Sequence, residues 1–159
     1  AALLAIAARD RGEVPVAFQC LIYPMLDDRT GALGPLGKKV APHVGKLVWT
    51  ADSNRFGWGA LQGDYSGQDH RKGWFSPSLA DDLSGLPRTW IGTGSLDLFL
   101  DEDLDYTRRL IAAGVPTELH VYPGAIHAFQ IIADGHLAQA FNRDLLGTVA
   151  RWLGLKPRA

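Results

Sequence analysis

Residues 90–97 read Trp-Ile-Gly-Thr-Gly-Ser-Leu-Asp, an apolar run of β-forming residues that ends at an acid, Asp97. Residues 118–127 read Glu-Leu-His-Val-Tyr-Pro-Gly-Ala-Ile-His, a second β-forming run that ends at His127. A helical pattern separates the two runs, which is typical of parallel strands joined by a crossover helix. The carboxyl ends of parallel strands meet at one edge of the sheet, where α/β folds bind their ligands. We therefore expect Asp97 and His127 to lie within hydrogen-bonding reach at that edge.

The rest of the chain alternates between helical and extended patterns in the same way. Such alternation favours an α/β fold, with a mostly parallel sheet covered by helices on both faces. The chain has 159 residues, enough for one domain with its own core. The sequence predicts strands at 14–23, 89–96 and 117–123, and helices at 1–11, within 49–62, at 101–113 and at about 133–153.

Local signals refine three of these elements. Gly12 is predicted to end the first helix as a left-handed cap, and Thr50 or Asp52 to begin the second. The third helix carries the apolar residues Leu104, Leu110 and Ile111 and is predicted to end at Gly114. The charged run at 27–29 follows the first strand and is interpreted as a solvated loop.

Composition excludes several classes of protein. The formal net charge of −1 offers no basic surface for nucleic acid. The longest apolar runs fall short of the roughly twenty residues that a membrane-spanning helix needs. The single cysteine, Cys20, cannot form an internal disulfide, which favours a cytoplasmic protein. The histidines do not have the close spacing typical of a metal site, so no metal is expected.

Four segments, in order, carry a resemblance to a known family: 21–27 (Leu-Ile-Tyr-Pro-Met-Leu-Asp), 76–87, 95–102 and 122–129. Together they resemble the C-terminal half of an α/β-hydrolase of the hormone-sensitive-lipase-like group of carboxylesterases. The chain departs from the group at two positions. Leu98 stands where proline is usual, and Ala128 where glycine is usual. Neither change removes a chemical group, so both are expected to affect loop geometry only.

The resemblance implies a hydrolase of short- to medium-chain acyl esters that needs no cofactor. His127 would take the proton of a serine hydroxyl and pass it to the leaving alcohol, while Asp97 orients the imidazole. None of the six serines lies in the Gly-x-Ser-x-Gly context of a nucleophile elbow. Residues 1–159 are therefore expected to form a partial domain without the nucleophile elbow and oxyanion loop, and to be inactive alone.

Further residues and partners follow from the resemblance. Apolar residues near this edge of the sheet could line the substrate pocket: Trp58, Leu98, Phe99 and Phe129, with Leu98 and Phe129 preferred to Trp58. The alternative is that they simply belong to the core. Small-molecule esters are the expected ligands. Relatives of this group often form homodimers through the edge of the last strand, so the same pairing is an expectation here.

Alternatives remain at this point. Asp97 could instead cap the following helix, and His127 could simply pack in a loop. The missing elbow could carry a cysteine or an aspartate, or belong to a peptidase. A non-catalytic ligand-binding protein on the same fold is the further alternative, because fold alone does not guarantee activity.

Overall fold

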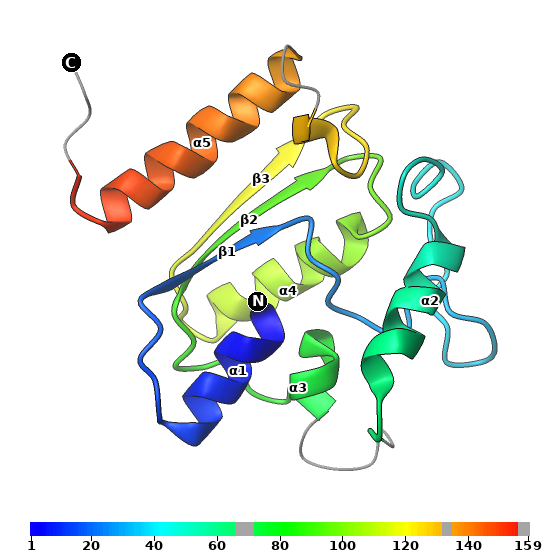
Figure 1. Ribbon diagram of the computed structural model, residues 1–159, viewed down its shortest axis with the longest axis horizontal. Coiled ribbons are helices and arrows are strands. Elements are labelled where there is room, and N and C mark those ends of the chain that lie inside the picture. Colours follow the sequence, from blue (N-terminus) through cyan, green and yellow to red (C-terminus); the bar gives the residue numbers. More distant parts are fainter. Residues whose placement is uncertain (66–71, 132–134, 156–159) are drawn as a thin grey trace.

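The computed structural model describes residues 1–65, 72–131 and 135–155 (Figure 1). The described part contains three strands, each followed by helical segments, in the order that the sequence predicts. The strands are β1 (Phe18–Ile22), β2 (Arg88–Gly94) and β3 (Thr117–Tyr122). The helical segments are α1 (Ala2–Arg11), α2 (Ala51–Gln62), α3 (Lys72–Phe75), η1 (Pro77–Leu79), α4 (Leu100–Ala112), η2 (Phe129–Ile131) and α5 (His136–Trp152).

The strands form one parallel sheet in the order β1-β2-β3. Central β2 aligns Ile91 with Leu21 of β1 and with Leu119 of β3. All three strands point the same way, toward the side where α2 lies (Figure 1). The predicted α/β architecture is therefore confirmed, and the ends of all three strands share one edge.

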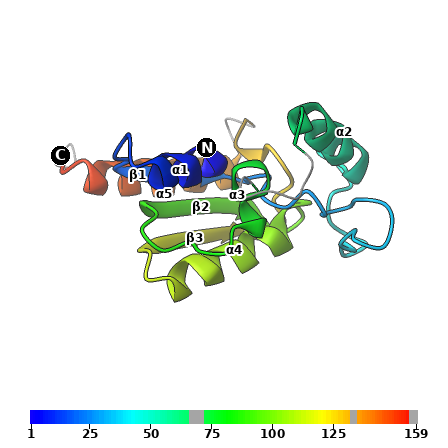
Figure 2. The ribbon, with the colours of Figure 1, turned by 90° about the horizontal axis from the view of Figure 1, so that it is seen from below.

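Successive residues of β2 point to opposite sides of the sheet, so its apolar side chains need helices on both faces to bury them. Ile91 belongs to an apolar cluster with residues of α1 and α4, including Ile6 and Tyr106. Its neighbour Trp90 belongs to a second cluster with Phe141 of α5. Accordingly α4 and α5 lie on opposite sides of β2 and β3 (Figure 2). The side chains of Trp90 and Ile91 are both fully buried, which fixes β2 as the centre of the sheet.

One expectation about the core was wrong. The first strand is shorter than predicted, because Val14 and Val16 are exposed and lie outside β1. In α4 the side chains of Leu104 and Ile111 are 41% and 58% exposed. The buried face of α4 runs instead through 103, 106, 107 and 110, the spacing of one helical stripe. Leu110, the third apolar residue of this helix, is fully buried on that face.

The predicted helix boundaries are mostly confirmed. Gly12 caps α1 in the left-handed conformation, with φ of 66°. Thr50, rather than Asp52, is the N-cap of α2, and its side chain accepts a hydrogen bond from the Ser53 N–H. The last helix begins at His136, and the predicted start at 133–134 lies outside the described residues. Within the described part of the chain, no helix is both long and apolar enough to cross a membrane.

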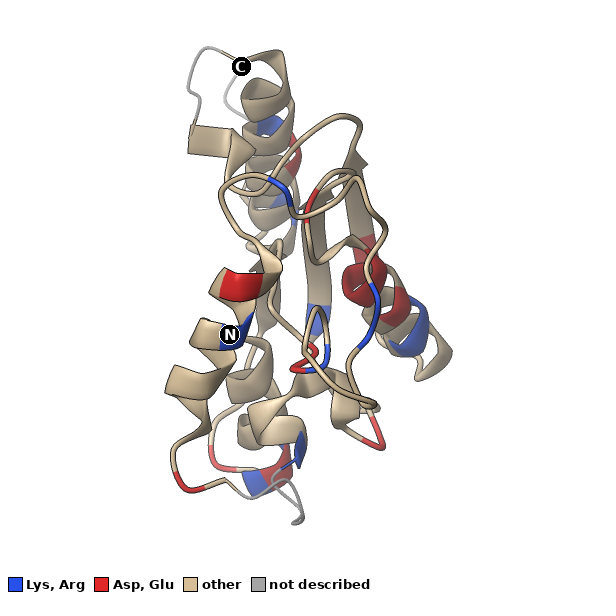
Figure 3. Cartoon of the chain, turned by 90° about the vertical axis from the view of Figure 1, so that its right-hand side faces the viewer, with Lys and Arg blue, Asp and Glu red and all other residues tan. Residues whose placement is uncertain are grey.

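Charge is distributed along α4 as its dipole favours. Asp101, Glu102 and Asp103 stand in the first turn, and Arg109 in the last (Figure 3). A negative charge at the start of a helix and a positive charge at its end are stabilised by the partial charges of the unpaired backbone groups. This applies here to the exposed Asp101 and to Arg109, whereas burial raises the pKa of Glu102 and of Asp103. The start of α4 lies three residues beyond Asp97, so this acidic turn borders the candidate site.

Candidate active site

The turn that carries Asp97 is bound to the loop that carries His127. After β2 ends at Gly94, the Ser95 N–H donates to the Tyr122 carbonyl and the Leu96 N–H to the Ala125 carbonyl, at 3.0 and 2.9 Å. Gly94 is required for this approach, since a Cβ there would lie 2.3 Å from the Ala125 carbonyl oxygen. Backbone contacts between the two loops thus fix the positions of the acid and the histidine.

Asp97 and His127 form a hydrogen-bonded pair. The Asp97 Oδ2 and His127 Nδ1 atoms are 3.0 Å apart, and the carboxylate is fully buried while the imidazole is 14% exposed. The second carboxylate oxygen, Oδ1, accepts the Phe99 N–H at 3.1 Å. Both oxygens are therefore engaged, one holding the carboxylate in its loop and one orienting the imidazole. Phe99, not Asp97, is the N-cap residue of α4.

The residue after His127 explains one departure from the family pattern. Ala128 has φ of 62°, a left-handed conformation that glycine adopts without steric cost. An alanine in this conformation costs about 1–2 kcal/mol. Ala128 therefore holds a conformation that would suit glycine, and an effect limited to loop geometry stays a prediction. Strained residues of this kind are often found beside functional sites.

Within the described residues, three aromatic rings surround the imidazole of His127. The Tyr23 ring is closest, with its centroid 4.3 Å from that of the imidazole, and the Trp49 and Phe99 rings are both at 5.6 Å. Tyr23 and Trp49 were not predicted to lie beside His127. Tyr23 follows directly on β1, so the rule that identified Asp97 and His127 would have placed it at the same edge. Trp49 lies in the loop before α2 and gives no comparable signal in the sequence.

The predicted pocket residues lie away from solvent. Leu98 is 2% exposed and packs close to Gly45, while Phe129 is 4% exposed and packs against Tyr122 and Phe141. Their contact with substrate stays a prediction. Trp58 is also buried, and its ring packs edge-on against Phe75 rather than beside His127.

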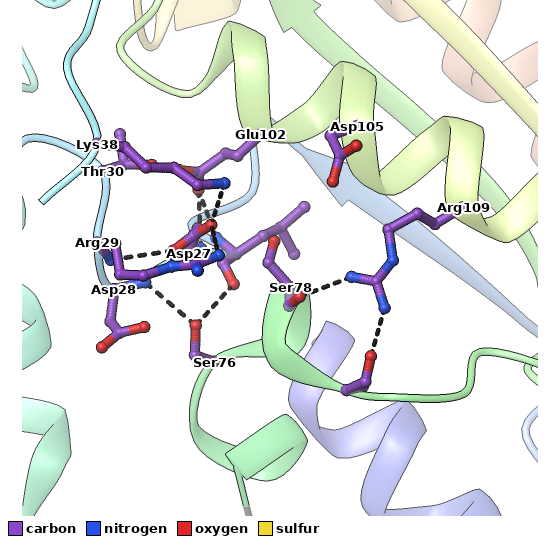
Figure 4. Close-up of polar contacts among 12 residues, drawn as sticks. Asp27, Asp28, Arg29, Thr30, Lys38, Ser76, Ser78, Glu102, Asp105 and Arg109 are labelled. Atoms are coloured by element: carbon purple, nitrogen blue, oxygen red, sulfur yellow. Dashed lines mark hydrogen bonds and ion pairs between the residues drawn. The ribbon is translucent and has the colours of Figure 1, made fainter. Parts of the chain in front are cut away.

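A second polar network supports the same edge of the sheet (Figure 4). Glu102 reaches from α4 to the loop after β1, where its carboxylate accepts the Leu26 and Asp27 N–H groups at 2.6 and 3.2 Å and the Thr30 hydroxyl. Asp27 is fully buried between Arg29 and Lys38. The interpretation of 27–29 as a solvated loop was therefore wrong, because only the fold brings Glu102 and Lys38 to this segment.

Burial has opposite outcomes for the two acids. Burial raises the pKa of Glu102 to about 8, and the hydrogen bonds from Thr30, Leu26 and Asp27 offset only part of that rise. Burial also acts to raise the pKa of Asp27, but hydrogen bonds from Arg29 and Lys38 outweigh it and hold that pKa below its usual value. The difference lies in the donors: Asp27 is bonded to two cationic side chains, whereas Glu102 is bonded only to neutral groups.

We predict that Glu102→Gln reduces the pH dependence of stability. The folded chain holds the Glu102 proton up to about pH 8, whereas the unfolded chain releases it near 4.5. The contribution of Glu102 is therefore fully present below pH 4.5 and falls by about 1.4 kcal/mol per unit as pH rises to about 8. A glutamine keeps an acceptor for the two N–H groups and a donor for Thr30, but it does not titrate. Urea unfolding at pH 6 and pH 9 measures the difference.

Glu102→Met is the comparison for this prediction. Methionine has a similar volume, but it leaves two buried N–H groups unpaired, at a cost of about 1–3 kcal/mol each at either pH. The glutamine variant should therefore equal or exceed the parent protein at pH 9, and the methionine variant should be less stable than the glutamine variant at both pH values. An unchanged pH slope in the glutamine variant would show that Glu102 is ionised throughout.

The described residues do not supply a nucleophile to His127. Ser76 is bonded to the Leu26 carbonyl, Ser84 to Asp82, and Ser95 to the Gly124 N–H. No serine in the described part of the chain is hydrogen-bonded to the imidazole, and Ser66 lies outside the described residues. The site thus presents an acid and a base, with the Nε2 edge of the imidazole left for a third group.

A parallel sheet covered on both faces, with a buried acid bonded to a histidine at the carboxyl ends of its strands, defines an α/β hydrolase. The chain belongs to the alpha/beta hydrolase fold family, whose model matches residues 1–131. The resemblance to the hormone-sensitive-lipase-like carboxylesterases is thereby confirmed. Both Asp97 and His127 lie within the matched region.

Relatives and solved structures agree with this assignment. The chain is 31% identical over 130 residues to "Esterase LipI" of Mycobacterium tuberculosis, covering 81% of this chain and 38% of that protein. It is 33% identical over 128 residues to "Carboxylesterase NlhH" of the same species, covering 80% and 39%. The structure titled "Bacterial Heroin Esterase" matches with a TM-score of 0.81 at 33% identity, covering 96% of this chain and 47% of that one. The chain spans less than half the length of each.

Proposed function

We propose that Asp97 and His127 are the acid and base of a carboxylic ester hydrolase. The observation that carries this proposal is the 3.0 Å contact between Asp97 Oδ2 and His127 Nδ1, made by a carboxylate that is fully buried. With Nδ1–H donated to Asp97, the lone pair of Nε2 is directed away from the acid and serves as the base. The relatives named esterase and carboxylesterase support ester hydrolysis as the reaction.

The proposed reaction passes through an acyl-enzyme. His127 Nε2 removes the proton of a serine hydroxyl while that oxygen attacks the ester carbonyl carbon. The imidazolium, stabilised by Asp97, then protonates the leaving alcohol as the carbon–oxygen bond breaks. Water repeats the sequence and releases the acid. Because the described residues supply no such serine, we propose that a segment outside this chain carries it, together with the oxyanion donors.

The substrate class proposed is small esters with short to medium acyl chains. The aromatic surroundings of His127 support an apolar reacting group, since Tyr23, Trp49 and Phe99 line the imidazole. We propose that Leu98 and Phe129 pack behind these aromatic rings and so shape the wall of the substrate pocket. A cytoplasmic location and pairing of two copies through the β3 edge are retained as proposals. The sheet order supports the pairing, because β3 is an outer strand of the described sheet.

Asp97→Asn tests the role of the acid in a protein that contains these residues and the nucleophile. The asparagine keeps an oxygen for the Phe99 N–H but presents an amide to His127, so the imidazole is held in the wrong tautomer. We expect kcat for a nitrophenyl ester to fall by about 10⁴-fold, as the same change does in the serine-protease triad. Asp101→Asn, on the exposed start of α4, is the matched control and should keep its activity. Full activity in Asp97→Asn would remove the acid from the mechanism.

A further inference from the structure

Tyr23 is held in a conformation that a tyrosine rarely adopts. It follows the last residue of β1 with φ of 35°, on the left-handed side of backbone space. Its N–H donates to the Gly92 carbonyl at 2.7 Å, so the strained residue is still bound to β2. A non-glycine residue in such a conformation costs about 1–3 kcal/mol and persists only where its surroundings enforce it. The structure thus enforces one particular direction for this side chain.

That direction places the ring against His127 and the hydroxyl against Gln130. The Tyr23 ring centroid is 4.3 Å from that of the imidazole, with the planes inclined at 56°. The hydroxyl is hydrogen-bonded to the Gln130 side-chain amide. Gln130 lies in η2, three residues beyond His127. The bond is donated by Gln130 Nε2, and Gln130 Oε1 is buried without a hydrogen-bond partner in the described part of the chain. If the amide were turned over, Oε1 would face the Tyr23 hydroxyl instead, so Tyr23 is the partner in either orientation.

Tyr23 therefore contacts the segment that carries His127 at two places. Its ring packs against the imidazole, and its hydroxyl is bonded to Gln130 in η2. An imidazole bonded to Asp97 can still rotate about its χ angles unless its faces are packed. We propose that Tyr23 is a positioning residue, which holds the His127 ring in the rotamer that points Nδ1 at Asp97 and Nε2 at the nucleophile. This inference rests on the proposed function, because it assigns a role in the same reaction.

The ring and the hydroxyl of Tyr23 have separate roles in this proposal. The ring supplies packing against the imidazole, and Tyr23→Phe keeps it while removing the hydroxyl. Tyr23→Ala removes both parts. A misplacement of a catalytic group by about 1 Å can cost 10²-fold in rate. We expect Tyr23→Ala to lower kcat by about 30- to 100-fold with KM changed less than about threefold, and Tyr23→Phe to lower kcat by about threefold.

A double-mutant cycle tests the hydroxyl without disturbing the strand. Gln130→Met removes the partner amide from η2, and it should lower kcat about as much as Tyr23→Phe. Because both changes remove one hydrogen bond, the double variant should be no slower than either single variant. Tyr122→Phe is the matched control, since its hydroxyl is bonded to Asp144 on the α5 side at 3.1 Å. Additive losses in the cycle would overturn the role of the hydroxyl.

A spectroscopic measurement separates this inference from the proposed function. The proton between His127 Nδ1 and Asp97 Oδ2 gives its own far-downfield proton NMR signal, whether or not any ester is hydrolysed. We expect that signal to be lost in Tyr23→Ala and retained in Tyr23→Phe, in folded protein with unchanged far-ultraviolet circular dichroism. A retained signal in Tyr23→Ala, or kcat within threefold of the parent protein, would overturn the inference. All of these variants are made in a protein that contains residues 1–159 and the nucleophile. If that protein hydrolyses no ester, the proposed function fails, and the NMR comparison still decides the role of Tyr23.

Discussion

Replacement of His127 by alanine is expected to lower kcat for ester hydrolysis by on the order of 10⁶-fold, the cost of removing the histidine from a serine-protease triad. The imidazole alone accepts the nucleophile's proton and returns it to the leaving group, so alanine removes both steps. KM should change little, because the alanine deletes no group that binds the ester in its ground state. Initial rates with nitrophenyl acetate and butyrate, measured on a protein that contains the nucleophile, provide the test.

His120→Ala is the control for this variant. His120 lies in β3 beside Glu118 and Asp144, with its nitrogen atoms 3.7 Å from a carboxylate oxygen of each. Its loss removes an imidazole without touching Asp97. Activity should therefore survive in His120→Ala and disappear in His127→Ala, while both remain folded. Turnover that persists in His127→Ala would show that another group is the base.

The sequence identified the acid and the histidine because both follow a simple rule of parallel sheets. Each stands just past a β-forming run, and the strands of successive units align, so Asp97 and His127 had to meet at one edge. Gly94, the second glycine of the first run, has a structural role as well, since only glycine at this position lets the two loops approach. Local pattern and tertiary geometry agree at this point of the chain.

The surroundings of the pair were less predictable. Tyr23 follows a strand, but tyrosine before proline reads equally well as the end of a core strand. Trp49 reaches His127 from a loop that has no periodicity. Asp27 and Glu102 are 75 residues apart in the chain, and each looks like an ordinary charged surface residue until the fold buries them together. Contacts between distant segments, rather than local preference, decide the chemistry of these groups.

The 159-residue chain by itself is expected to show essentially no ester hydrolysis. We expect its kcat to lie on the order of 10⁶-fold or more below that of a protein in which the same residues follow a Gly-x-Ser-x-Gly segment, because loss of the nucleophile alone costs that much. Ser76, Ser84 and Ser95 are already engaged in hydrogen bonds with other groups. Loss of one oxyanion donor costs a further factor of about 10²- to 10³-fold. These donors are expected from the residue after the nucleophile and from a separate oxyanion loop.

A serine-to-alanine variant of the longer protein allows a direct comparison with the 159-residue chain. Serine to alanine in the added segment should reduce the longer protein to the level of the shorter chain, while Asp97 and His127 remain in place. A fluorophosphonate should label the longer protein at that serine and leave the shorter chain unmodified, and mass spectrometry identifies the modified residue. Rapid turnover by the shorter chain that depends on His127 would place the nucleophile among residues 1–159. Labelling at a cysteine would keep the fold and the acid–histidine pair but change the chemistry, because a thiolate would then attack the ester.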